Sequence, residues 1–398
     1  MNTPRLHLSL RLILAWAVLG GSLSVIRADP AATVDEPAPV ADLRPLDPAV
    51  WSRKAVSYSG FRSGQSPVTG VLPGREEIWE DLNLLRDAGF GLIRVYGSGG
   101  HGRDVVETIA KEGLDIRVQL GVYLSGSRQD KGDANRAEIE AAIALANAHP
   151  DVVAAVSVGN EVLVSWSFVP VPPADMIAYL REVRSRVKQP VTVNDNWEPY
   201  AAAAGSPIAR VWGQVDYASV HTYAYWDAGF NLWDFRQLAV PEERRARAMM
   251  DAAAAYARAN FAAVRSALDA AGRRIPIVIG ETGWQNLPSA HLKEARVQDF
   301  ARHQAHPANQ AWYFADMMAW AYGVDGSAPG DGFSRPAAMF YFSAFDEPWK
   351  KADDNWGLWD AARRPKPALK PQTHSHAAAV FYRDAGRAEE KQTDLVRE

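Results

Sequence analysis

The sequence predicts an α/β protein, a single-domain (β/α)8 TIM barrel, and three observations lead to this fold class. Apolar strand-like segments alternate with amphipathic helical segments over most of the chain, which is typical of repeated βα units. Eight strand-like segments can be counted, the number that closes such a barrel. Two of them run into a glycine and then a glutamate, as buried parallel strands deliver acids at their carboxyl ends.

The expected strands are short apolar runs rich in β-branched and aromatic residues. They are Ala55–Tyr58, Leu92–Tyr96, Ile116–Val122, Val152–Val158, Val191–Asn194, Tyr217–His221, Ile275–Ile279 and Ala338–Ala344. Helices are expected between them, where apolar residues recur at three- and four-residue spacing. The clearest are Glu76–Ala88, Ala134–Ala148, Ala174–Val187, Arg244–Ala271 and Gln310–Tyr322.

A doubly wound open sheet is the competing fold, because it also alternates strands and helices. Such a sheet needs a phosphate-binding glycine turn after an early strand. Gly97, Gly99 and Gly102 match the Gly-x-Gly-x-x-Gly spacing, but they follow the second expected strand, and no ribose-binding acid is apparent. We interpret this segment as a flexible loop at the rim of a cleft.

Composition narrows the class of protein. The 398 residues are 47% hydrophobic, enough for one large core, and the net charge of -4 without a basic block argues against nucleic-acid binding. Zero cysteines exclude disulfides and thiolate metal sites, and no dense histidine cluster is present, so we expect neither metal nor other cofactor. Fourteen tryptophans supply flat faces of the kind that stack on sugar rings, although most of them are expected to fill the core.

The amino terminus resembles an export signal. An apolar run of 15 residues, Leu12–Ile26, follows two arginines and is short for a membrane span. We expect a signal peptide over 1–28, a flexible Pro/Ala-rich linker over 29–50, the catalytic domain over 51–370 and a polar tail over 371–398. The mature protein is then secreted or periplasmic, without stable membrane insertion; an uncleaved anchor is the alternative.

Two glutamates are the strongest candidates for chemistry. Glu161 ends the expected fourth strand and Glu281 the seventh, so both belong at the carboxyl end of the barrel. A pair of carboxyls there is the minimum equipment for cleaving a glycosidic bond: one protonates the leaving oxygen, and the other attacks the anomeric carbon or activates water.

Three motifs in order resemble glycoside hydrolase family 17, the β-1,3-glucanases and β-1,3-glucanosyltransferases. They are Val158-Gly159-Asn160-Glu161, Gly280-Glu281-Thr282-Gly283-Trp284, and Phe345-Asp346-Glu347-Pro348-Trp349-Lys350 followed by Asn355-Trp356-Gly357-Leu358. The resemblance covers roughly Lys54 to Pro367. It implies a retaining mechanism with Glu161 as acid/base and Glu281 as nucleophile. Gln285 stands where the family commonly has proline.

The same resemblance implies supporting residues. Asn160 matches the asparagine that touches the sugar 2-hydroxyl, and Tyr223 matches a tyrosine that hydrogen-bonds the nucleophile. Glu347 and Lys350 match a charged group that supports the site. The acidic group Asp346 and Glu347 is also the one serious rival for the catalytic acid, and Trp284 is expected to bind substrate or to support the site. His221 is either a core histidine or a member of the site.

Other candidates come from strand periodicity. Arg94 and Tyr96 share one face of the second strand, so both are expected inside the barrel, with Glu281 or a structural carboxylate as the partner of the arginine. Four more residues are expected in loops at the cleft, where they could contact sugar: Trp166, Asp195, Trp197 and Trp226.

The expected partner is a β-glucan, and we expect a monomer. Hydrolysis and transglycosylation use the same residues, so both stay open, as do endo and exo action. A noncatalytic β-glucan-binding barrel is the alternative function, although such a protein is expected to have lost one of the two glutamates. A metal-dependent hydrolase ranks lower, because strand ends would then supply several His and Asp ligands.

Overall fold

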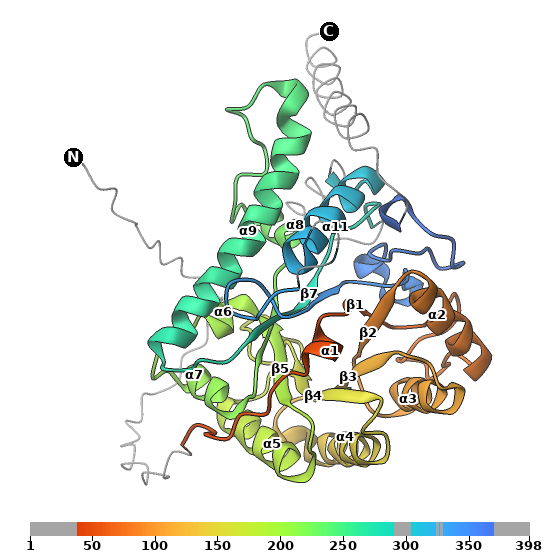
Figure 1. Cartoon of the computed structure of the whole chain (residues 1–398), viewed down its shortest axis with the longest axis vertical. Helices are drawn as coiled ribbons and strands as arrows, with labels where there is room; N and C mark the ends of the chain where they lie inside the picture. The colour runs from red at the N-terminus through yellow and green to blue at the C-terminus, as the bar shows by residue number, and fades with distance from the viewer. Residues whose placement is uncertain (1–37, 290–303, 324–325, 327–328, 370–398) are drawn as a thin grey trace, which may run out of the picture. The chain divides into compact units, whose positions relative to one another are not determined.

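Eight parallel strands close into one barrel in chain order, as the sequence predicts (Figure 1). The computed structural model describes residues 38–289, 304–323, 326 and 329–369. The strands are β1 (Lys54–Ser57), β2 (Phe90–Val95), β3 (Arg117–Val122), β4 (Val153–Asn160), β5 (Val191–Asn196), β6 (Ala218–His221), β7 (Ile277–Thr282) and β8 (Met339–Tyr341). Pairing of β8 with β1, for example Phe340 with Ala55, completes the ring and excludes the doubly wound sheet.

Helices surround the strands (Figure 1). They are α1 (Pro48–Trp51), α2 (Arg75–Asp87), α3 (Gly100–Glu112), α4 (Arg128–Ala148), α5 (Pro173–Arg186), α6 (Trp197–Tyr200), α7 (Pro207–Val211), α8 (Ala224–Gly229), α9 (Glu242–Ala270) and α11 (Pro307–Tyr322), with 3-10 turns η1 (Trp212–Gln214), η2 (Pro348–Asp353) and η3 (Pro367–Leu369). The five helices expected from apolar spacing are all present; four lie within three residues of their expected bounds, and α4 begins six residues earlier than expected, at Arg128.

The barrel interior changes from apolar to charged along its axis. At the amino-terminal end, Trp51 of α1 packs edge-on against Tyr217 and Phe340, with ring centroids 5.1 and 6.2 Å apart. Leu92 and Val278 belong to the same buried cluster. Inward-facing side chains alternate with outward-facing ones along each strand. The inward-facing ones close the amino-terminal end of the barrel with apolar groups, and polar groups lie at the carboxyl ends of the strands.

The glycine segment is not a flexible loop, and this expectation is wrong. Gly100 begins α3, whose N-cap is Gly99, and the helix continues to Glu112. Gly102 is required in its first turn, because a Cβ there would lie 1.8 Å from the carbonyl oxygen of Gly97. The placement at the cleft rim is correct, since Gly97, Gly99 and Gly102 line the cleft.

The barrel unit begins at Pro39, so the end of the expected linker belongs to the fold. The N–H of Val40 donates to the carbonyl of Gly213 at 2.8 Å, and the Arg44 guanidinium donates to the carbonyls of Arg184 and Gln189 at 2.7 and 2.8 Å. These hydrogen bonds satisfy backbone groups that water would otherwise solvate. The Pro/Ala-rich composition of the segment does not reveal them.

The expected signal peptide 1–28, the linker up to residue 37 and the tail 371–398 lie outside the described residues. Within the described part of the chain, no helix combines the length and apolarity that crossing a membrane requires.

Candidate active site

A layer of polar side chains fills the middle of the barrel and supports the site. The Asn194 amide donates to Gln119 at 3.1 Å, and the Ser219 hydroxyl donates to Asn194. Gly280 of β7 fits against this layer because it has no side chain: a Cβ would lie 2.5 Å from Asn194 Oδ1. The layer therefore sets the depth at which the next residue, Glu281, enters the barrel.

Glu281 is buried, and hydrogen bonds occupy both of its oxygens. Arg94 Nη1 donates to Oε1 at 2.5 Å, and the Tyr223 hydroxyl donates to Oε2 at 2.5 Å. Arg94 Nη1 also lies 3.1 Å from the Gly280 carbonyl. Of the two partners expected for Arg94, Glu281 is confirmed. The carboxylate is thus fixed in position by one cation and one phenol.

The surroundings of Glu281 favour its ionised form. Burial alone raises its pKa, but the charge that His221 carries when protonated, the Arg94 guanidinium, the Tyr223 hydrogen bond and the Lys350 ammonium together lower it, to about 2. Glu281 is therefore a carboxylate at neutral pH, which is the form that a nucleophile needs.

Glu161 follows β4 in a left-handed backbone conformation, with a φ of 49°. A residue other than glycine pays roughly 1–3 kcal/mol for such a conformation, so neighbouring contacts must maintain it. Its N–H donates to the Asn194 carbonyl at 2.9 Å, and a quarter of its side chain is exposed. The Asn160 side-chain oxygen accepts a hydrogen bond from Arg94 Nη2. One arginine thereby ties the β4 end to the β7 acid.

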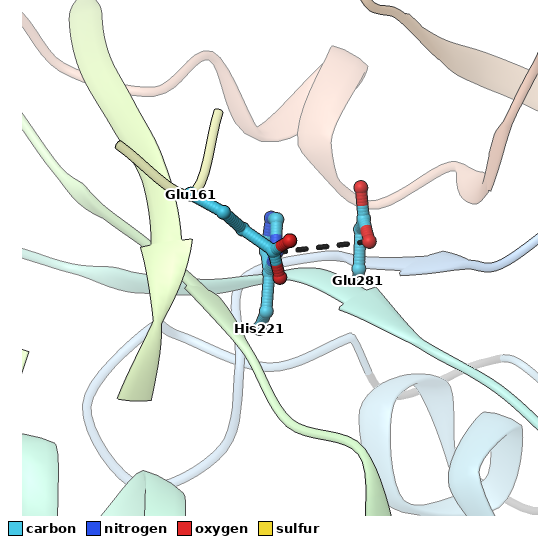
Figure 2. A group of neighbouring side chains, drawn as sticks. All are labelled: Glu161, His221 and Glu281. Atoms are coloured by element: carbon cyan, nitrogen blue, oxygen red, sulfur yellow. Dashed lines mark hydrogen bonds and ion pairs between the residues drawn. The ribbon is translucent and has the colours of Figure 1, made fainter. Parts of the chain in front are cut away.

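His221 of β6 lies between the two glutamates (Figure 2). Its Nδ1 is 3.0 Å from Glu161 Oε1 and 3.6 Å from Glu281 Oε2. Arg94 Nη1 approaches Nε2 at 3.3 Å. Because arginine offers no acceptor, a neutral His221 with its ring proton on Nδ1, facing the carboxylates, is compatible with this contact. In that form, Arg94, the Tyr223 hydrogen bond and Lys350 are the groups that lower the pKa of Glu281.

The separation of the two acids matches one class of glycosidase. One oxygen of Glu161, one oxygen of Glu281 and a His221 ring nitrogen all lie within 4.8 Å of one another. Retaining glycosidases hold their carboxyls about 5–5.5 Å apart, whereas inverting enzymes need about 6.5–9.5 Å to admit a water. The geometry therefore fits a retaining pair.

These three side chains also form a set of oxygen and nitrogen donors that a divalent cation could use. Two features argue against that use. Both oxygens of Glu281 already accept hydrogen bonds, and the Arg94 guanidinium beside them repels a second cation. The donor set is better suited to proton transfer and nucleophilic attack than to metal binding.

Glu347 and Lys350 form an ion pair at the cleft. Lys350 Nζ lies 2.7 Å from Glu347 Oε2, and Trp349 Nε1 donates to Oε1 at 3.1 Å. The glutamate is only 3% exposed, so both oxygens are held in place with little contact with water. This arrangement suits a supporting group better than a rival proton donor.

An open cleft of about 1300 Å³ lies over the acid pair. Nine of the residues expected at the site line it: Tyr96, Asn160, Glu161, Trp166, Tyr223, Trp226, Glu281, Glu347 and Lys350. Arg94 does not line the cleft; it lies beneath it and is 2% exposed.

The loop positions expected at the cleft for Trp197 and Asp195 are wrong, and of the two roles expected for Trp284 only a supporting one fits its position. Trp284 is fully buried, and its Nε1 donates to the Gln304 carbonyl at 2.8 Å. It lies two residues beyond the end of β7, where its ring packs against Tyr225 and Tyr313. Trp197 begins α6 and packs on the core instead of lining the cleft. Asp195 belongs to β5, not to a loop, and is fully buried.

Gln285, where the resembling family commonly has proline, is also buried. It accepts a hydrogen bond from the Tyr225 hydroxyl at 2.9 Å and donates to the Asp354 carbonyl at 2.9 Å. The amide side chain thereby ties this loop to the segment after β8, through a contact that a proline could not make.

Several cleft residues were not anticipated. Tyr58 directly follows β1, and the strand-end rule used for the glutamates could have found it. Three aromatic residues of loops following strand ends also line the cleft: Tyr123, Phe168 and Phe230. Phe168 is 98% exposed at the cleft.

The model of the BtgE/BtgC glycoside hydrolase domain matches residues 55–358 of this chain. A curated relative, a glucan 1,3-beta-glucosidase of Arthroderma benhamiae, is 26% identical over 329 residues, which cover 78% of this chain and 90% of the relative.

Two solved structures share the fold. One is an endo-laminarinase from Formosa, with a TM-score of 0.66 and 23% identity, covering 78% of this chain and 84% of that one. The other is a glycoside hydrolase family 17 β-1,3-glucanosyltransferase from Rhizomucor miehei, with a TM-score of 0.54 and 18% identity, covering 81% and 98%. At these identities the likeness establishes the barrel fold and nothing finer.

Proposed function

Because the chain belongs to the BtgE/BtgC glycoside hydrolase family, we propose that it cleaves β-1,3-glucan with retention of configuration, through Glu161 and Glu281. The names of the curated relative and of both structural neighbours support the choice of glucan. The three sequence motifs and the family 17 neighbour support the finer assignment to a family 17 type of enzyme.

The observation that carries this proposal is that two carboxyl groups lie close together in very different surroundings. Glu281 is buried, ionised and held by Arg94 and Tyr223. Glu161 is a quarter exposed and is held by fewer side chains, so it can exchange protons with the cleft. Paired carboxyls with different surroundings are the means by which glycosidases divide nucleophile and acid/base roles.

In the first step, a Glu281 oxygen attacks the anomeric carbon while Glu161 gives its proton to the glycosidic oxygen. The bond between that carbon and oxygen breaks, the shortened sugar leaves with the proton, and a glycosyl ester to Glu281 remains. Arg94 and Tyr223 hold the carboxylate in line for attack, so little reorganisation is needed.

In the second step, the now ionised Glu161 takes a proton from an incoming hydroxyl, whose oxygen attacks the same carbon and releases Glu281. Water as that nucleophile gives hydrolysis, and a sugar hydroxyl gives transglycosylation. The exposed aromatic residues Trp166 and Phe168 offer surfaces for the outgoing or incoming sugar.

Digestion of laminari-oligosaccharides tests the proposal. Mass spectrometry of the products separates hydrolysis, which yields only shorter chains, from transfer, which also yields longer ones. Proton NMR of the first products should record the β anomer before mutarotation. Initial α-anomeric products would refute retention, and the absence of any cleavage would favour the alternative, a noncatalytic glucan-binding barrel.

We further propose that the mature protein is a monomer outside the cytoplasm, secreted or periplasmic. The apolar run Leu12–Ile26 behind two arginines supports the location. Cell fractionation with an antibody to the barrel should find the protein in the periplasm or the medium. Recovery of the full-length chain in the cytosol would refute the location, and a dimer mass in light scattering would refute the monomer.

A further inference from the structure

Asp195 is a fully buried carboxyl at the end of β5, and backbone N–H groups are its recorded partners. Leu163 N–H donates to Oδ2 at 2.9 Å, and Asn196 N–H donates to Oδ1 at 2.8 Å. Val162 N–H is a further donor. Two of these three donors belong to the residues directly after Glu161. No ion pair recorded for the described residues includes Asp195, so it does not serve as the partner of a buried cation.

The turn that Asp195 holds is a strained one. Glu161 has a φ of 49°, and its own N–H donates to the Asn194 carbonyl at 2.9 Å. The N–H groups of residues 161, 162 and 163 therefore all donate hydrogen bonds to two adjacent residues of β5, Asn194 and Asp195. A left-handed residue other than glycine persists only where its surroundings over-determine it, and these bonds supply that constraint.

We propose that Asp195 is a positioning residue for Glu161: its oxygens fix the turn after β4 and thereby aim the Glu161 carboxyl at the glycosidic oxygen. This inference rests on the proposed function. Asp195 does not line the cleft and so does not touch substrate; it acts through the Val162 and Leu163 N–H groups. Both the protonated and the ionised carboxyl accept hydrogen bonds, so the role does not depend on its charge.

Two substitutions and one control test the role. Asp195→Ala removes both acceptors, whereas Asp195→Asn keeps one oxygen for the Leu163 N–H. The control is Asp216→Asn. Asp216 is also a buried carboxyl that accepts backbone N–H groups, from Val191 at 2.8 Å and Arg44 at 2.9 Å. These contacts are at the start of β5, at the other end of the barrel from Glu161.

The measurement is kcat/KM on two substrates, a laminari-oligosaccharide and a dinitrophenyl β-glycoside, either of glucose or, for an endo-acting enzyme, of a laminari-oligosaccharide. The natural substrate needs a proton from Glu161, and the activated one needs almost none. A misplaced acid should lower kcat/KM on the oligosaccharide by about 10²-fold in Asp195→Ala, and by less in Asp195→Asn. The aryl substrate should change by less than about threefold in both, because the nucleophile is untouched.

Asp216→Asn should instead lower both kcat/KM values by the same factor, or neither. Equal losses on both substrates in the Asp195 variants, or an Asp195→Ala enzyme that matches the wild type, would overturn the inference. If Asp195→Ala does not fold, the same comparison is made with Asp195→Asn, whose kcat/KM should fall on the oligosaccharide and not on the aryl substrate.

The wild type and Glu161→Ala separate this inference from the proposed function. If the wild type cleaves neither substrate, or if Glu161→Ala loses both equally, the proposed function itself has failed. If Glu161→Ala shows the leaving-group pattern and the Asp195 variants do not, the catalytic assignment stands and only the positioning role is refuted.

Discussion

At the scale of single residues, the two glutamates differ in what surrounds them, and this difference predicts different defects. Replacing Glu281 by Ala should reduce turnover of every glucoside below detection, because no glycosyl ester can form. Added azide should then attack from the opposite face and give an inverted glycosyl azide, which NMR identifies.

Replacing Glu161 by Ala should give a different signature. Glucan kcat/KM should fall by ~10²–10⁴, while kcat/KM on a dinitrophenyl β-glucoside is retained, since an activated phenolate needs little protonation. Azide should here resolve the glycosyl ester to a retained product. Circular dichroism should match the wild type for both variants. If Glu347→Ala showed this leaving-group pattern instead, the acid/base assignment would move to Glu347.

Two tryptophans predict a second contrast. Trp284 is fully buried against Tyr225 and Tyr313, with ring centroids 5.2 and 5.4 Å away. Trp284→Ala should therefore lower the free energy of unfolding by about 3–5 kcal/mol in urea titration. Trp166 lines the cleft and is 49% exposed. Trp166→Ala should change stability by less than about 0.5 kcal/mol and raise KM for oligosaccharides instead. Unfolding data that reversed the order would contradict the assignment.

At the scale of elements, β7 is packed tightly at Gly280, where side chains of β5 and β6 leave no room for a side chain. A methyl group on Gly280 would lie 2.5 Å from Asn194 Oδ1 and 2.6 Å from Ser219 Oγ. Gly280→Ala should cost about 1–3 kcal/mol of unfolding free energy and should also lower kcat, because relief of the clash moves Glu281.

Gly132→Ala is the matched control. Gly132 lies in α4 with an ordinary φ, and a Cβ there meets no atom within 4 Å. This substitution should leave kcat unchanged and stabilise the protein by about 0.4–1 kcal/mol. Differential urea unfolding and initial rates on the same preparations check both variants. A Gly280→Ala enzyme with normal kcat would show that the polar layer does not set the position of Glu281.

At the scale of the whole molecule, two buried acids make stability depend on pH in opposite directions. Burial, opposed by backbone hydrogen bonds, raises the pKa of Asp195 to about 8. Its protonation therefore favours the folded state, and this contribution is lost as pH rises from about 4 towards 8. The pKa of Glu281 is lowered, so its contribution is present above its ordinary value of 4.5 and is lost as pH falls towards 2.

Asp195→Asn tests this dependence, since an amide does not ionise. Between about pH 4 and pH 8, the unfolding free energy of the variant should fall less steeply with rising pH than that of the wild type. The difference in slope is limited to about 1.4 kcal/mol per pH unit for one proton. Urea titrations at one-unit pH steps measure it. Parallel profiles would mean that Asp195 ionises in the folded protein as readily as in the unfolded chain.

The sequence by itself determined the barrel and the positions of the two glutamates in it, because the signals for both are local. Alternation of short apolar runs with helical periodicity depends only on neighbouring residues, and it predicted all eight strands. A glutamate directly after a strand-like run is placed by that strand alone. Arg94 and Tyr96 were placed inside by the two-residue period, which is equally local.

Only the tertiary structure decided what depends on register between distant strands. His221 could be a core residue or part of the site until β6 was set beside β7, with Nδ1 facing both glutamates. Strand-end position also suggested that Trp284 and Asp195 would reach the cleft, whereas Trp284 is buried beyond the end of β7 and Asp195 is buried in β5, where it accepts a hydrogen bond from the turn after β4. A small shift along a strand changes which face a side chain occupies, and closure of the ring, which no local pattern encodes, fixes that shift.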